Sequence, residues 1–137
     1  MKTLIVDDVA SNQVILKYML QDYGPCFIAD NGQQAIDLFT EMLREGKPFD
    51  LVLMDVQMPD IDGLTALKEI RALEKLVYGE EVPFSMYSKI IMVTCNTEPS
   101  VVMESLMKLN ANAFIPKPVD KKTLLAKLAK QGLIYLP

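Results

Sequence analysis

The sequence predicts an α/β protein, a doubly wound sheet of five parallel strands with helices on both faces. Short apolar runs without polar alternation recur along the 137 residues, as is typical of strands buried on both sides. Segments with apolar residues at helical spacing lie between these runs. Because the two patterns alternate along the chain, we expect right-handed crossovers and a central parallel sheet. Residues 1–137 are expected to form a single domain.

Five apolar runs are the expected strands. In chain order they are residues 4–6, 26–29, 51–54, 90–93 and 113–115. The second run carries the weakest pattern of the five. Residues 79–88 lack any regular pattern and are expected to form a long loop before the fourth strand.

Five helices are expected, one after each strand. Their apolar residues recur at helical spacing over residues 14–20, 35–43, 64–76, 102–109 and 124–133. Ser11 or Asn12 is the expected N-cap of the first helix, and Asp120 is that of the last. Asn110 suits a left-handed residue at the end of the fourth helix.

The composition excludes several classes of function. A formal charge of −4 and a pI near 4.8 argue against direct nucleic-acid binding, which usually needs a basic face. No apolar run approaches the roughly 20 residues of a membrane span, so we expect a cytoplasmic protein without a membrane segment. Cys26 and Cys95 lack metal-binding spacing and are expected to be reduced thiols, with Cys95 buried. The chain has no histidine, which excludes a Ser-His-Asp triad and a phosphohistidine carrier.

Polar residues gather where the expected strands end. Asp7 and Asp8 close the first strand, and Asp55 closes the third. Thr94 closes the fourth strand, and Lys117 lies just past the fifth. Because ligands bind beyond the carboxyl ends of parallel strands, we expect these five side chains to share one site.

A divalent cation would resolve the repulsion among the three acids. Two unit charges about 4 Å apart repel by about 4 kcal/mol at an effective dielectric of about 20. Oxygen ligands without His or Cys favour Mg²⁺, with Mn²⁺ as the second choice. Lys117 can pair with Asp55 or with a phosphoryl oxygen, and Thr94 can bond another such oxygen. Since an aspartate can be a nucleophile and phosphoryl transfer depends on positioning and charge, the site suits that chemistry.

Four stretches of the sequence resemble the response-regulator receiver domains of two-component signalling. They are Leu4-Ile5-Val6-Asp7-Asp8, residues 53–59 with Asp62-Gly63, Ile91-Met92-Val93-Thr94 and Phe114-Ile115-Pro116-Lys117-Pro118. They occur in the family's order and near its spacing, over essentially the whole chain. The resemblance implies a flavodoxin-like (βα)5 fold with strand order 2-1-3-4-5. A receiver of the hybrid-kinase type is favoured over the chemotaxis type.

The same resemblance implies the phosphoacceptor and the metal ligands. Asp55 is the expected phosphoacceptor. Asp8 and Asp55 would bind Mg²⁺ directly, Asp7 would bind it through water, and the backbone carbonyl of Gln57 would be a further ligand.

It also implies a catalytic set of Asp55, Thr94 and Lys117, with a cis peptide between Lys117 and Pro118. Thr94 and Phe114 would form a switch pair, although Phe114 suits plain core packing equally well. The donor would be a histidine kinase or a histidine phosphotransfer protein. Phosphorylation would change the surface built by the fourth helix, fifth strand and fifth helix, for a downstream target that the sequence leaves unnamed. Such a protein catalyses only its own phosphorylation and dephosphorylation, as a monomer or a weak phosphorylation-linked dimer.

Three alternatives share parts of this pattern. A phosphatase of the haloacid dehalogenase-like class requires a second acid two positions after the nucleophile as general acid/base, and this chain has Gln57 there. A degenerate receiver that serves as a scaffold would not need intact acids, threonine and lysine. A flavodoxin-like FMN binder needs a Ser/Thr/Gly-rich loop after the first strand, where Asp7 and Asp8 would repel its phosphate.

The sequence also departs from the receiver pattern at three places. The stretch from Asp55 to Thr94 is longer than the pattern, and the surplus lies in residues 79–88. Cys95 replaces a small residue and could narrow access to the site, and Asn110 stands where glycine is common. None of these departures touches the acids or the lysine.

Overall fold

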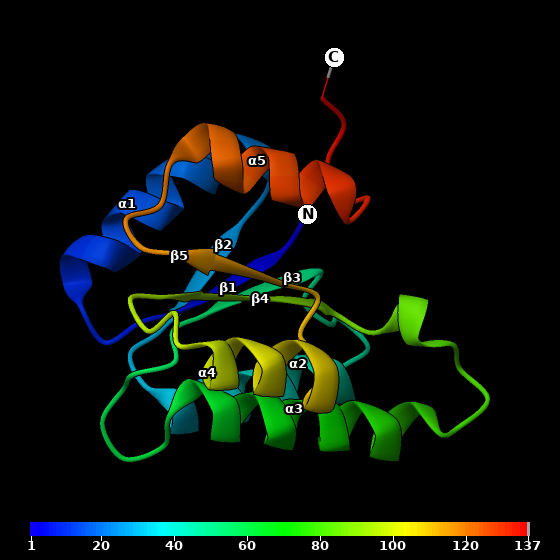
Figure 1. The fold of residues 1–137 in the computed structure, drawn as a ribbon. Coiled ribbons are helices and arrows are strands. Elements are labelled where there is room, and N and C mark those ends of the chain that lie inside the picture. The colour runs from blue at the N-terminus through cyan, green and yellow to red at the C-terminus, as the bar shows by residue number, and fades with distance from the viewer. Residues whose placement is uncertain (137) are drawn as a thin grey trace.

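A single sheet of five parallel strands organises the computed structural model, which describes residues 1–136. The strand order is β2-β1-β3-β4-β5, as expected (Figure 1). The strands are β1 (Thr3–Val6), β2 (Cys26–Ala29), β3 (Leu51–Met54), β4 (Lys89–Thr94) and β5 (Ala113–Pro116). All five lie on the predicted apolar runs, and β4 extends far enough to include Thr94. Pro137 lies outside the described residues, so the single domain of residues 1–137 stays a prediction.

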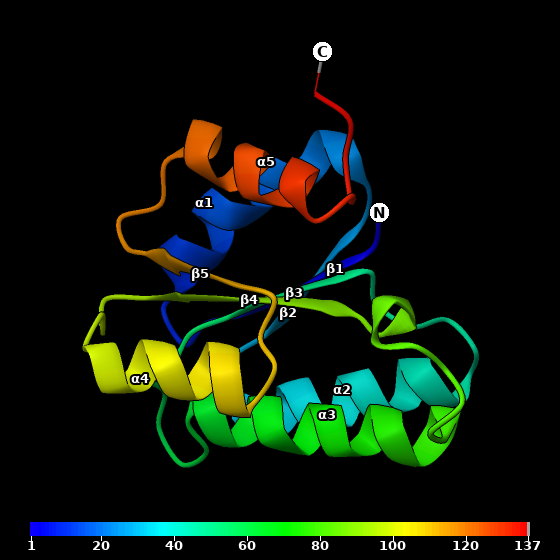
Figure 2. The ribbon, with the colours of Figure 1, turned by 45° about the vertical axis from the view of Figure 1, so that its right-hand side comes forward.

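Helices cover both faces of the sheet, α1 and α5 on one side and α2, α3 and α4 on the other (Figures 1 and 2). Their bounds are α1 (Ala10–Leu20), α2 (Gly32–Arg44), α3 (Gly63–Tyr78), α4 (Pro99–Met103) and α5 (Lys121–Lys130). Short 3₁₀ turns follow α1 at Gln21–Tyr23 and precede β4 at Phe84–Met86. Among residues 1–136, no helix has the length and apolar character needed to cross a membrane.

The strands are apolar on both faces because each face packs against helices. Ile5 and Leu53 belong to one buried cluster, together with Leu16 of α1 and Leu124 of α5. Val52, the neighbour of Leu53 in β3, belongs to the cluster on the opposite face. Successive residues of a strand point to opposite faces, so a strand buried on both faces shows no polar alternation.

One predicted helix start is confirmed and another is wrong. Asp120 caps α5 as expected, because its side chain accepts a hydrogen bond from the Lys122 amide. The expected cap of α1 at Ser11 or Asn12 is wrong, because α1 begins at Ala10 after Val9. The carboxylate of the preceding strand-end residue, Asp7, accepts the Val9 amide at 2.9 Å and so orders this turn itself.

The fourth helix also differs from its expected range. It begins at Pro99, because proline suits the first helical position, and it continues as a π-helical turn over Glu104–Lys108. Asn110 follows with a φ of 61°, the left-handed conformation that was predicted for it. No residue of α4 itself is fully buried, and its Val101 packs partly buried against the core.

A buried ion pair lies at the end of the sheet opposite the acids, on α3. Arg71 Nη1 lies 2.7 Å from Glu74 Oε1, and both side chains are almost fully shielded from solvent. Arg71 also donates to the Ser88 carbonyl at 2.8 Å and to the Asn110 carbonyl at 2.9 Å. Glu74 accepts the Ser88 amide at 2.8 Å. The pair therefore ties the end of the long 79–88 loop and the chain after the π turn to α3.

Candidate functional site

Strand register brings the two central acids together. Val6 of β1 lies opposite Met54 of β3, so the next residues, Asp7 and Asp55, emerge side by side. The Asp55 amide donates to the Val6 carbonyl at 3.0 Å, which extends the ladder by one step. Asp8 follows Asp7 as the chain leaves the sheet. The carboxyl ends of β1 and β3 thus supply all three acids.

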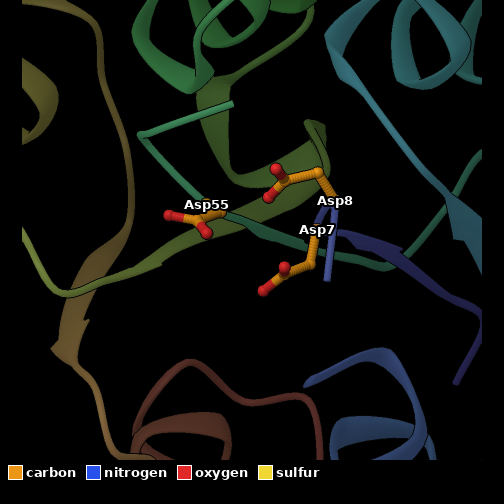
Figure 3. Close-up of side chains that lie close together, drawn as sticks. All are labelled: Asp7, Asp8 and Asp55. Carbon is orange, nitrogen blue, oxygen red and sulfur yellow. The ribbon is translucent and has the colours of Figure 1, made fainter. Parts of the chain in front are cut away.

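Asp7, Asp8 and Asp55 form a compact cluster, here called the acidic cluster (Figure 3). Each offers a carboxylate oxygen, and these oxygens lie within 4.8 Å of one another. Asp7 and Asp55 are 1% and 6% exposed, whereas Asp8 is open to solvent. Three close carboxylates with oxygen-only ligands fit a hard divalent cation such as Mg²⁺ or Mn²⁺.

Lys117 neutralises part of this charge. Its Nζ lies 2.8 Å from Asp7 Oδ2 and 2.8 Å from Asp55 Oδ2. Burial alone would lower the pKa of Lys117, but the hydrogen bonds and charges of Asp55 and Asp7 raise it above its ordinary value. The ammonium group therefore stays protonated at neutral pH and bridges two of the three acids. The cis peptide between Lys117 and Pro118 is present, as predicted.

A close helix approach fixes the backbone at Asp55. The Gly63 amide donates to the Val56 carbonyl at 2.8 Å as α3 begins. A Cβ atom added to Gly63 would lie 1.9 Å from the Asp55 carbonyl oxygen, so only glycine fits at this position. Oδ1 of Asp55 accepts a long hydrogen bond of 3.3 Å from the backbone amide of Gln57.

The two proposed switch residues lie in different surroundings. Thr94 ends β4, is fully buried, and accepts the Asn96 amide at 3.2 Å through Oγ1. Phe114 is half-buried in β5, pairs with Met92 and packs against the core under α2, α3 and α4. The structure therefore brings Thr94 to the site and places Phe114 in the adjoining core.

A cleft of about 610 Å³ opens beside the acidic cluster. Its lining includes Asp55, Thr94 and Lys117 together with apolar residues of α1. Cys95 lines the same cleft and is exposed, so the expected burial of this thiol is wrong. It is the first residue after β4, where the chain has already left the protection of the sheet. Gln57 lines this cleft and a second one of about 520 Å³ next to it.

Sequence reasoning missed two polar residues behind the acidic cluster. Gln13 is a buried residue of α1 whose Nε2 donates to the Asp7 carbonyl at 2.6 Å and to Asp30 Oδ1 at 2.8 Å. Asp30 follows β2, so it lies at the same edge of the sheet. A polar residue three positions before the buried Leu16, on the same helix face, is the signal that could have revealed Gln13.

Known proteins resemble this chain over almost its full length. Residues 3–129 match the family model of the response regulator receiver domain. The chemotaxis protein CheY of Bacillus subtilis is 33% identical over 94% of this chain and 95% of its own. The crystal structure of Vibrio cholerae chemotaxis protein CheY4 superposes with a TM-score of 0.74 at 28% identity, covering 94% of this chain and 96% of that one.

A hybrid kinase is also among the relatives. The hybrid signal transduction histidine kinase B of Dictyostelium discoideum is 32% identical over 96% of this chain. The chain spans only 7% of that kinase's length. Receivers of the chemotaxis type and of the hybrid-kinase type both occur among the relatives, so the preference for the hybrid-kinase type stays a prediction. The fold, the acidic cluster with its lysine and the match over residues 3–129 agree, and the chain belongs to the response regulator receiver domain family of two-component systems.

Proposed function

We propose that the protein accepts a phosphoryl group on Asp55 from a phosphohistidine of a histidine kinase or a histidine phosphotransfer protein, in a Mg²⁺-dependent reaction. One observation carries the proposal. Lys117 Nζ bridges the carboxylates of Asp7 and Asp55 at 2.8 Å each, beside the third acid, Asp8. This arrangement supports a role for Asp55 as nucleophile, with the charge of Lys117 and a set of possible metal ligands beside it.

The hydrogen bonds favour Asp55 over Asp7 as the nucleophile. Asp7 Oδ1 accepts the Val9 amide at 2.9 Å, and Asp7 Oδ2 accepts Lys117 at 2.8 Å, so both of its oxygens are held. Asp55 Oδ1 has the long contact of 3.3 Å with the Gln57 amide, and Asp55 lines the open cleft. An Asp55 oxygen is therefore the better placed to attack.

In the transfer step, a carboxylate oxygen of Asp55 forms a bond to phosphorus while the bond from phosphorus to the donor's imidazole nitrogen breaks. The electron pair of the broken bond stays on the imidazole. Lys117 holds its proton throughout and pairs with a phosphoryl oxygen, and the hydroxyl of Thr94 donates a hydrogen bond to another. Asp8, Asp7, Asp55 and the Gln57 carbonyl would hold Mg²⁺ or Mn²⁺, which would offset the negative charge of the transferred group.

The phosphorylated state would be read through Thr94 and Phe114. A phosphoryl group adds a charge of about −1.5 to −2 beside Thr94. Movement of the Thr94 hydroxyl toward it would break the present bond to the Asn96 amide, at the start of the segment that leads to α4. The surface of α4, β5 and α5 would then change for a downstream partner. A cytoplasmic location, a monomer or weak dimer, and the lack of nucleic-acid binding stay predictions.

Labelling with acetyl phosphate or phosphoramidate in the presence of Mg²⁺ tests the assignment. We expect intact-mass spectrometry to detect one phosphoryl group on the wild-type chain and none on Asp55→Asn. Asp60→Asn is the matched control, because Asp60 is an exposed loop residue. Its backbone has a left-handed conformation, which asparagine also tolerates. Full labelling of Asp55→Asn would refute Asp55 as the acceptor, and labelling that persists in EDTA would refute the metal requirement.

A further inference from the structure

We infer that Gln13 and Asp30 form a positioning pair that holds the Asp7–Asp8 segment in the geometry needed to bind the metal. The inference rests on the proposed function, because it concerns the same metal ligands. Neither residue belongs to the acidic cluster, and neither lines the cleft of about 610 Å³. Their effect on the metal must therefore pass through the main chain of Asp7.

Both donor hydrogens of the Gln13 side-chain amide have partners. Its Nε2 donates one hydrogen to the Asp7 carbonyl at 2.6 Å and the other to Asp30 Oδ1 at 2.8 Å. An amide nitrogen has only two hydrogens to donate, so the group has a single orientation that satisfies both partners. Gln13 is 9% exposed and its bond to the Asp7 carbonyl is buried, so water cannot readily replace that bond.

Asp30 is in turn fixed by the second helix. Its backbone amide donates to Oε1 of Gln34 at 2.9 Å, near the start of α2. The backbone amide of Gln34 donates to Oδ1 of Asn31 at 2.8 Å, and Asn31 is the N-cap of α2. A continuous chain of hydrogen bonds thus runs from the first turn of α2 through Asp30 and Gln13 to the Asp7 carbonyl.

This chain matters most for Asp8. The main chain is pinned on both sides of Asp7, because the Asp7 amide donates to the Ala29 carbonyl at 3.2 Å and the Asp7 carbonyl accepts Gln13. The Asp7 carbonyl belongs to the peptide unit that joins Asp7 to Asp8. Rotation of this unit would swing the exposed carboxylate of Asp8, for which no hydrogen-bond donor is found within residues 1–136.

Magnesium makes such a support consequential. Mg²⁺ demands nearly ideal octahedral geometry with ligand distances of about 2.0–2.1 Å, so small displacements of one carboxylate weaken binding. Loss of a hydrogen bond that orients a metal ligand typically costs about 10- to 100-fold in metal affinity. We therefore expect Gln13 to govern the affinity for Mg²⁺ without contacting the ion.

Isothermal titration of Mg²⁺ into the full chain tests the inference with matched variants. Gln13→Met keeps the length of the side chain but removes its donors, and it should weaken Mg²⁺ binding about 10- to 100-fold. Gln33→Met is the control for the same chemical change, because Gln33 is exposed on α2 and bonds only to Asp37. The maximal rate of labelling by acetyl phosphate should recover at high Mg²⁺, because Gln13 touches none of the reacting atoms.

Asp30 provides a second comparison should Gln13→Met fold poorly in a urea titration. Asp30→Asn retains an acceptor oxygen for Gln13, whereas Asp30→Ala removes it, and both remove the charge. Mg²⁺ affinity should therefore fall further in Asp30→Ala than in Asp30→Asn. Equal affinities for the wild type and a folded Gln13→Met, or for the two Asp30 variants, would overturn the inference. A wild-type chain that does not bind Mg²⁺ would instead contradict the proposed function.

Discussion

The three carboxylates of the acidic cluster lie in three different surroundings. Asp7 is buried and held by Lys117 and by the Val9 amide. Asp55 is shielded but opens to the cleft, and Asp8 is exposed. Asp55 is therefore the acid that a ligand in the cleft can reach. Asp8 repels its two neighbours without a positive charge of its own to offset the repulsion.

Replacing Asp8 should therefore stabilise the metal-free protein. Asp8→Asn keeps the size of the side chain and removes one charge from a cluster whose oxygens lie within 4.8 Å. For an exposed group the expected gain is about 1 kcal/mol in the free energy of unfolding. Urea titration in EDTA measures it, with Asp60→Asn as the control that should change little. A lower stability of Asp8→Asn would show that repulsion does not dominate at this position.

The sequence was sufficient to place the acids, Thr94 and Lys117, because the carboxyl ends of adjacent parallel strands meet at one edge. It was not sufficient for Gln13, whose role depends on the direction of one amide inside the fold. Exposure of Cys95 was also missed, since a strand pattern does not show where the chain turns out of the sheet.

At the scale of elements, the strands were predictable and the helix ends were less so. Continuous apolar runs mark strands buried on both faces, and all five were found. The start of α1 depends on a hydrogen bond from Val9 to Asp7. The π turn at Glu104–Lys108 is closed by the Leu109 amide, which donates to the Glu104 carbonyl at 2.9 Å. The Arg71–Glu74 pair gave no sequence signal, because charged residues three apart on a helix usually lie on its wet face.

Removing Arg71 should be strongly destabilising. Arg71→Met leaves the buried Glu74 carboxylate unpaired, which typically costs about 3–5 kcal/mol in the free energy of unfolding. Lys75→Met is the control, because the Lys75–Glu80 pair is exposed and 3.6 Å apart, and it should change stability by about 0–1 kcal/mol. Urea unfolding compares the two. Similar losses in both variants would mean that the buried pair contributes no more than an exposed one.

The loss of unfolding free energy in Arg71→Met should depend on pH in one direction. Burial raises the pKa of Glu74, and Arg71 opposes that rise. Without Arg71 the carboxyl takes up a proton more readily in the folded than in the unfolded chain. Its stabilising protonated form is lost as the pH rises through the folded pKa, so the deficit should be larger at neutral pH than in acid.

At the scale of the whole molecule, stability is unevenly distributed. The central strands β1 and β3 are buried along their whole length between two helical layers. By contrast α4 has no buried residue, whereas α3 has six. Among the elements proposed to respond to phosphorylation, α4 is therefore the one least fixed by packing.

Native-state hydrogen exchange should reveal this difference. Amides of β1 and β3 are expected to exchange only on global unfolding, whereas α4 should open with a free energy several kcal/mol lower. Amides of α3 serve as the helical control and should resemble the strands. If α4 exchanged as slowly as α3, the helix would be part of the rigid core and an unsuitable element for a switch.

The exposed thiol of Cys95 offers a practical way to watch the site at work. The chain contains no tryptophan, so its intrinsic fluorescence comes from tyrosines alone. Cys95 lines the cleft beside Asp55, while the other thiol, Cys26, is partly shielded and has a pKa raised by burial. A thiol-reactive dye would therefore label mainly Cys95 under mild conditions. It would act as an optical reporter at the mouth of the cleft, where metal and phosphoryl groups would enter.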